Sequence, residues 1–127
     1  MATSIFFCAT FKQLFYNLVE KFKRAEDDLK AAIRAMPLNS REGDRMPSVG
    51  SFELRKIRLP LKAYNFSKRR GLRHINLIRS GAVEILYPVT IYKKGEIKNE
   101  DQVIAQVRIA VKNTLADIAN KNYTENL

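Results

Sequence analysis

Residues 71–92 read GLRHINLIRSGAVEILYPVTIY, a stretch with the pattern of a β-hairpin. Apolar and polar residues alternate over 71–78, and the more apolar segment 82–92 follows the turn-forming pair Ser80 and Gly81. This spacing predicts two antiparallel strands joined by a tight turn. Pro88 has no N–H group to donate to a neighbouring strand, so we expect an edge position, a bulge or a shorter strand there.

A third strand is predicted just upstream of this hairpin. Residues 52–61 alternate apolar positions with basic ones, and the alternation places Lys56 and Arg58 on the same face, two residues apart. Residues 37–51 hold two of the four prolines and most of the other turn-forming residues. This composition predicts a loop that leads into the three strands.

Helical spacing precedes the loop. Apolar residues recur every three or four positions over 10–36, with Thr10 as the candidate N-cap and Pro37 as the end. The apolar face shifts around residues 22–25. The pattern is therefore compatible with one long helix or with a helical hairpin bent at that point.

The two ends of the chain complete the predicted order. The apolar run 3–9 predicts a buried strand, and residues 100–121 return to helical spacing with Asn99 or Asp101 as the cap. The order is therefore a strand, one or two helices, three strands and a helix. Such an order predicts an α+β fold in a single domain, residues 1–127.

The chain is strongly basic and also apolar enough to fold. Its net charge is +10 at pH 7 and 46% of its residues are apolar, which excludes a disordered basic tail. Nine Lys or Arg residues and no acid lie between Leu54 and Ala82. A basic surface built on strands is typical of a polyanion site, and RNA and DNA are the commonest polyanions.

The residue types favour RNA cleavage without a metal or cofactor. Gly-rich phosphate loops, serine nucleophile motifs and paired-carboxylate motifs are all missing, and the basic strands lack the acids that a two-metal centre needs. RNA carries its own nucleophile, the 2′-hydroxyl, which needs a base, a charge stabiliser and an acid. A dense cationic cluster favours a neutral lysine amine, and arginines can hold phosphate oxygens in a fork. We therefore expect Lys56 and Arg58 to meet the scissile phosphate.

The other reactive side chains are placed by their neighbours. His74 alternates with Arg73, so it should point to the opposite face as a hydrogen-bonded core histidine if Arg73 faces phosphate. The lone Cys8 lies in an apolar run and is expected to be a small core residue. Tyr87 is expected to pack in the core, whereas Tyr92 is a candidate for base stacking or proton donation.

Five segments resemble, in the same order, the RelE/ParE superfamily of bacterial toxins from type II toxin–antitoxin systems. Two of them resemble the family's Gly-x-Arg-hydrophobic strand and its Tyr-x-Lys segment. The five are Met36–Pro37, Gly43–Pro47, Leu54–Leu59, Gly71–Ile75 and Ile91–Glu96. The resemblance implies an α+β fold in which an N-terminal strand and a helical hairpin pack on a small antiparallel β-sheet, followed by a C-terminal helix.

The resemblance also implies an activity. RelE-like members cleave mRNA, often in the ribosomal A site, with lysines and arginines on the sheet in place of a metal. It implies Lys56 as the base, Arg58 as its basic partner and Arg73 as the stabiliser of the phosphate. The implied catalytic set is Lys56, Arg58, Arg73, Tyr92 and Lys94, and the RNA-binding set is Arg55, Lys62, Lys68, Arg69, Arg70 and Lys93.

Two features depart from the family pattern. Many ribosome-dependent members place a catalytic tyrosine or histidine near the C-terminus, where this chain offers only Tyr123 in a polar tail. The insert Lys62–Arg70 is longer than in compact members, which would change or block substrate engagement.

The expected partners follow from the same resemblance. They are mRNA, with or without the ribosome, and a cognate antitoxin protein. Because the chain has no apolar run of about 18 residues and begins without a positive leader, we expect a cytoplasmic protein that does not enter a membrane. Two alternatives stay open at this point: a ParE-like inhibitor of DNA gyrase and a non-catalytic nucleic-acid-binding module.

Overall fold

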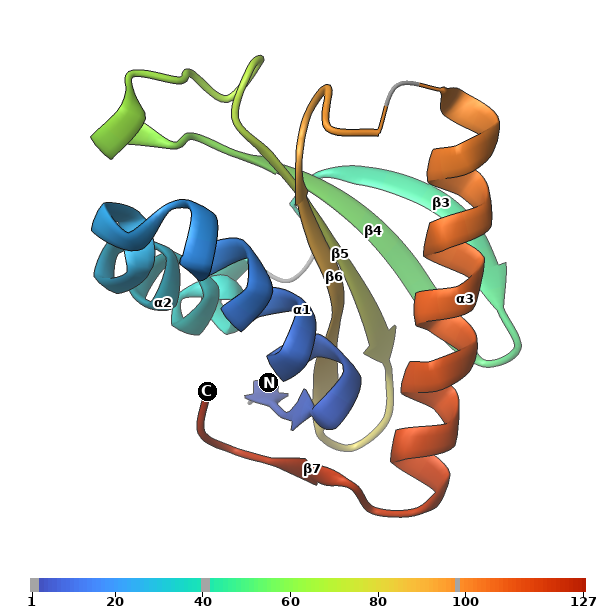
Figure 1. The fold of residues 1–127 in the computed structure, drawn as a ribbon. Helices are drawn as coiled ribbons and strands as arrows, with labels where there is room; N and C mark the ends of the chain where they lie inside the picture. Colours follow the sequence, from blue (N-terminus) through green and yellow to red (C-terminus); the bar gives the residue numbers. More distant parts are fainter. Residues whose placement is uncertain (1–2, 40–41, 98) are drawn as a thin grey trace.

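The computed structural model describes residues 3–39, 42–97 and 99–127, and its main elements are drawn in Figure 1. Its elements confirm the α+β fold with an N-terminal strand, a helical hairpin, a sheet and a C-terminal helix. In chain order they are β1 (Thr3–Ile5), β2 (Phe7–Cys8), α1 (Ala9–Lys21), α2 (Glu26–Arg34), β3 (Asp44–Val49), β4 (Phe52–Leu59), β5 (Leu72–Arg79), β6 (Glu84–Lys93), α3 (Glu100–Ala119) and β7 (Tyr123–Thr124).

The main sheet has five strands in the order β1-β6-β5-β4-β3. Strands β3 to β6 are antiparallel to their neighbours, as the alternation predicts, but β1 pairs with β6 in parallel. The sheet is therefore mixed and not wholly antiparallel. The connection from β1 to β6 spans most of the chain, so no local hairpin turn dictates the direction of this strand.

The predicted loop 37–51 is wrong in part, because residues 44–49 form the edge strand β3. Most side chains of β3 are exposed, so the strand lacks the alternation of apolar and polar residues that reveals β4 and β5 in the sequence. Pro47 is tolerated there, since an edge strand needs only one side of its backbone for pairing. The pairing with β4 is also irregular between Met46 and Val49.

Of the three options for Pro88, the structure contains the bulge. Ile75 of β5 pairs with Thr90 of β6, whereas the next residue, Asn76, pairs with Pro88. Val89 is therefore the extra residue, and the missing N–H of Pro88 is accommodated inside an interior strand.

The helical stretch bends where the apolar face shifts. Helix α1 ends at Lys21, a 3₁₀ turn covers Lys23–Ala25, and α2 follows at once, so the hairpin option is confirmed. The predicted cap at Thr10 is wrong, because α1 begins at Ala9. The backbone N–H and the hydroxyl of Thr10 instead donate hydrogen bonds of 2.9 and 2.7 Å to the carboxylate of Asp117 in α3.

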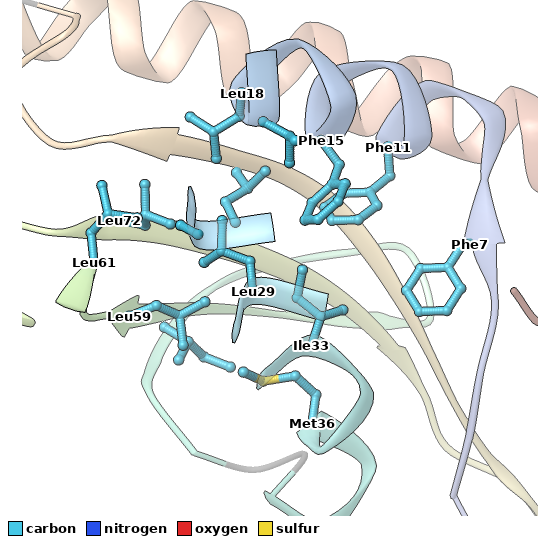
Figure 2. Close-up of a cluster of buried hydrophobic side chains, with 14 of the residues drawn as sticks. Phe7, Phe11, Phe15, Leu18, Leu29, Ile33, Met36, Leu59, Leu61 and Leu72 are labelled. Atoms are coloured by element: carbon cyan, nitrogen blue, oxygen red, sulfur yellow. The ribbon is translucent and has the colours of Figure 1, made fainter. Parts of the chain in front are cut away.

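Two apolar clusters lie on opposite faces of the sheet. Figure 1 shows α1 and α2 against one face and α3 against the other. On the first face, Phe11 and Phe15 of α1, Leu29 of α2 and Leu72 of β5 belong to one buried cluster, drawn in Figure 2. On the second face, Val107 and neighbouring residues of α3 cover β4 to β6. The helices thus cover most of the sheet, and functional side chains must lie where they do not.

Asn99 caps α3, as one of the two sequence options predicts. Its side-chain oxygen accepts hydrogen bonds from the backbone N–H groups of Asp101 and Gln102, at 2.8 and 3.4 Å. We expect Asn99→Ala to lower the free energy of unfolding by about 1 kcal/mol, measured by urea denaturation. Asn99→Asp, which keeps an accepting oxygen, serves as the control. An alanine variant as stable as the aspartate variant would contradict this role.

No helix in the described part of the chain combines the length and the apolar character needed to cross a membrane.

Candidate nucleic-acid interface

Three predicted site residues form a row across the three middle strands of the sheet, β4, β5 and β6. Arg58 of β4 lies directly opposite Arg73 of β5, which lies directly opposite Tyr92 of β6. Cross-strand partners share a face, and Lys56 joins them because it lies two residues from Arg58. We call Lys56, Arg58, Arg73 and Tyr92 the basic row. The row lies on the α3 face, because Tyr92 packs against the apolar cluster beneath α3. It lies at the end of the sheet where β4 and β6 end and β5 begins.

Arg73 differs from the other members because its guanidinium is directed into the protein. Only 6% of the residue is exposed. Its Nη1 donates hydrogen bonds to the backbone oxygens of Lys68 and Leu72 at 2.9 and 3.2 Å, and its Nη2 donates to the oxygen of Arg69 at 3.0 Å. Burial and the positive charge of Arg58 lower the pKa of Arg73. The guanidinium therefore holds backbone carbonyls where the resemblance implies a phosphate.

Lys93 holds the same segment from the neighbouring strand. Its ammonium donates hydrogen bonds to the backbone oxygens of Arg70 and Lys94. The Nζ also lies 4.1 Å from the centre of the Phe66 ring, which favours a cation at that place. The predicted RNA-binding role of Lys93 is thus accompanied by an internal one.

The segment held by Arg73 and Lys93 is the turn Ser67–Arg70, which we call the basic turn. A backbone hydrogen bond of 3.1 Å from Arg70 to Ser67 closes it, and the side chains of Lys68, Arg69 and Arg70 are exposed. Gly71 follows the turn in a position that excludes any side chain. A Cβ atom there would lie 2.2 Å from the backbone oxygen of Leu59 and 2.8 Å from that of Ser67.

Arg55 lies away from the basic row. It alternates with Lys56 and so faces the other side of the sheet, where its Nη2 lies 3.0 Å from the Glu53 carboxylate and its Nη1 donates to the Gly43 oxygen at 3.1 Å. Arg45 of β3 lies 3.4 Å from the same carboxylate. The structure therefore places the predicted RNA-binding residue Arg55 in an ion-pair cluster. The acid of this cluster, Glu53, lies one residue before the acid-free stretch.

The remaining predicted cations are exposed around the row. Lys62 lies in the short 3₁₀ turn Lys62–Tyr64, after β4, and Lys94 lies in the turn after β6. The backbone N–H of Lys94 donates to the oxygen of Gly71 at 2.9 Å, which fixes that turn beside the start of β5. The structure thus brings Lys94 and the basic turn to the same end of the sheet.

Sequence reasoning missed an acid beside the row. Strand β3 places Asp44, which is exposed, directly opposite Lys56. Opposite charges on cross-strand neighbours attract one another. The position could not be found from spacing, because it depends on the pairing of an edge strand that the turn-rich composition conceals.

Tyr92 is half-buried at the border of a cleft. Burial raises the pKa of its hydroxyl, an effect that the charge of Arg73 opposes. The cleft has a volume of about 170 Å³ and lies between α1, β6 and α3. At its rim, Lys21 and Glu96 form an ion pair at 3.6 Å. The hydroxyl therefore stays protonated near neutral pH, beside space that is not filled by protein.

His74 is buried in the core, as predicted, on the face opposite the row. Its ring stacks edge-on against Phe11 of α1 with 5.5 Å between ring centres. Burial lowers its pKa to about 4, although the Asn76 side chain and the Thr90 backbone favour the protonated form. Among the described residues, neither ring nitrogen has a hydrogen-bond partner of good geometry, which differs from the predicted hydrogen-bonded histidine.

The other reactive side chains also lie in the interior. Cys8 is buried, and burial raises the pKa of its thiol to about 12, which agrees with the predicted core role. Tyr87 packs in the core as expected. Tyr123 belongs to β7 and packs against Phe6 and Tyr87, at ring-centre distances of 5.1 and 5.9 Å. Since Tyr87 lies five residues from Tyr92 along β6, Tyr123 is remote from the row.

Within residues 3–39, 42–97 and 99–127, no group of three or more His, Cys, Asp or Glu side chains is arranged to hold a metal ion. The functional groups of the basic row and the basic turn are amines, guanidinium groups and the phenol of Tyr92, with Asp44 beside them.

Comparison with known proteins finds no matching family model, no matching curated protein and no matching solved structure.

Proposed function

We propose that this chain is a toxin of the RelE/ParE type, from a type II toxin–antitoxin system, that cleaves mRNA without a metal. The observation that carries the proposal is the basic row, in which Lys56, Arg58 and Tyr92 share one face of the sheet beside the basic turn. A cationic site with a protonated phenol offers the groups that phosphate-ester cleavage needs.

The proposed reaction uses the RNA 2′-hydroxyl as the nucleophile. Lys56 takes the 2′-hydroxyl proton while the 2′-oxygen attacks the adjacent phosphorus. Arg58 stabilises the additional negative charge on the phosphate oxygens. Tyr92 donates its proton to the 5′-oxygen as the P–O5′ bond breaks. The products are a 2′,3′-cyclic phosphate and a free 5′-hydroxyl. One proton has moved from the 2′-hydroxyl to Lys56 and one from Tyr92 to the 5′-oxygen.

The structure leads us to change one role. The guanidinium of Arg73 already donates hydrogen bonds to backbone carbonyl oxygens. We therefore assign the stabilisation of the phosphate to Arg58, which is exposed. Lys62, Lys94 and the basic turn contribute electrostatic attraction to the RNA backbone. The ribosome and a cognate antitoxin protein complete the proposal as partners.

The decisive experiment incubates the purified chain with mRNA in excess EDTA, with and without ribosomes. We expect cleavage products that carry 2′,3′-cyclic phosphate and 5′-hydroxyl ends, which end-labelling identifies. Intact RNA under both conditions, or cleavage that EDTA abolishes, would contradict the proposal. Inhibition of DNA gyrase supercoiling by the same preparation, with RNA left intact, would favour the ParE-like alternative.

A further inference from the structure

We propose that the basic turn is a preformed docking site for the backbone of single-stranded RNA, and that Arg73 and Lys93 are positioning residues that build it. The inference rests on the proposed function for the identity of the ligand. The construction of the turn is a separate claim that can be tested without RNA.

Charged side chains hold the three consecutive backbone carbonyl groups of residues 68–70. Nη1 of Arg73 binds the oxygen of Lys68, Nη2 of Arg73 binds that of Arg69, and the ammonium of Lys93 binds that of Arg70. Each of these hydrogen bonds has a charged donor, which makes it stronger than a bond between neutral groups. Two cations from neighbouring strands therefore fix a complete three-residue segment.

The direction of the carbonyls determines what the turn presents to solvent. With their oxygens directed at Arg73 and Lys93, residues 68–70 expose all three of their basic side chains. The turn is closed by the bond from Arg70 to Ser67, and the next residue, Gly71, lies so close to the backbone of Leu59 that no side chain would fit there. Three adjacent cations are thus displayed from a backbone that is ordered before any ligand binds.

This arrangement matches a ligand with closely repeated negative charge. A fixed backbone lowers the entropy that binding must overcome, and each contact with a phosphate releases a condensed counterion. The turn also adjoins the basic row through Arg73, which is a member of the row and the anchor of the turn. A strand of RNA whose scissile phosphate reaches Arg58 would therefore pass near the turn. An acidic polypeptide is the competing ligand, and the experiment includes it.

The first test probes the construction of the turn by limited digestion with trypsin, which cuts after lysine and arginine. We expect Arg73→Gln to increase the rate of cleavage within residues 68–70 about tenfold, because loss of its charged hydrogen bonds favours local opening. Arg79→Gln, the same change at the far end of β5, is the matched control. Lys93→Met, which keeps the stem over Phe66, is a second variant on another strand.

The digestion has two clear outcomes. Faster cleavage in Arg73→Gln and Lys93→Met, with Arg79→Gln unchanged and Arg73→Lys between the extremes, would support the positioning role. Cleavage at the control rate in both Arg73→Gln and Lys93→Met would overturn it. Circular dichroism identifies a globally unfolded variant. If Arg73→Gln or Lys93→Met unfolds, the cleavage rate of the other variant is the test of the positioning role.

The second test measures binding of single-stranded RNA at several salt concentrations. Replacing Lys68, Arg69 and Arg70 together by alanine should reduce the slope of log affinity against log salt by about 2. Arg73→Gln should weaken binding in the wild type but have little further effect in this triple variant, because it acts through the turn. Fully additive effects would overturn the inference, since they indicate that Arg73 contacts RNA by itself.

The two proposals fail in different ways. Binding with the predicted slope but without cleavage would contradict the nuclease and support the docking site. Cleavage with a slope that the triple variant leaves unchanged would support the nuclease and overturn the docking site. Tighter binding of polyglutamate than of RNA, with the same dependence on the turn, would overturn the assignment of the ligand.

Discussion

Replacing Lys56 by alanine should reduce the rate of RNA cleavage by a factor of about 10²–10⁴, the usual contribution of a positioned general base. The Cα register fixes Lys56 on the face of Arg58, two residue pairs along from the Arg58–Arg73 pair. Loss of its amine removes the group that accepts the 2′-hydroxyl proton, whereas Arg58 still binds the phosphate. We therefore expect the single-turnover rate constant to fall while the affinity for RNA changes little.

A matched pair of variants separates charge from proton transfer. Lys56→Arg places a permanent positive charge at the same position but cannot act as a base near neutral pH, so its rate should fall nearly as far as that of the alanine variant. Lys62→Ala removes an exposed lysine outside the row and should mainly weaken binding. A Lys56→Arg variant with the rate of the wild type would show that Lys56 supplies charge alone.

The largest expected effect on stability comes from His74 as the pH falls. Its pKa in the folded state is about 4, below the ordinary value of 6.5, so the unfolded chain takes up the proton first. The contribution of His74 is therefore complete above pH 6.5 and is lost progressively between pH 6.5 and 4. The shift corresponds to about 3 kcal/mol of unfolding free energy between those limits.

Urea denaturation at several pH values measures this effect. In His74→Leu the group that titrates is absent, so its unfolding free energy should depend less steeply on pH over the same window. Carboxylates titrate in both proteins, and the difference between the two curves isolates the histidine. Parallel curves for the wild type and His74→Leu would contradict the low pKa.

The sequence predicts those elements that leave a periodic signal. Apolar and polar residues alternate in the sequence of β4 and β5, and the Ser80–Gly81 pair marks the turn into β6, so these strands could be located. Strand β3 was not predicted, because an exposed edge strand has no buried side to produce an alternation of apolar and polar residues. The parallel pairing of β1 also left no signal, because its partner is distant in the chain.

The sequence could predict which face of the sheet each site residue lies on, but not which atoms its side chain contacts. The period of two assigned Lys56, Arg58 and Arg73 to one side, and the register agrees. It could not show that Arg73 turns its guanidinium toward the basic turn, since that depends on a loop whose path follows from tertiary packing. It could not show Asp44 beside Lys56 either, since that neighbour comes from another strand.

The tie between the two ends of the chain has a consequence for biosynthesis. Strand β2 pairs with β7, and the start of α1 binds Asp117, a residue 107 positions later. Contacts at such separations form late, because the intervening chain must first be ordered or closed into a loop. While residues 117–124 are still inside the ribosomal exit tunnel, the N-terminal helix lacks these partners. During synthesis, the N-terminal helix therefore completes its packing only once residues 117–124 have left the exit tunnel.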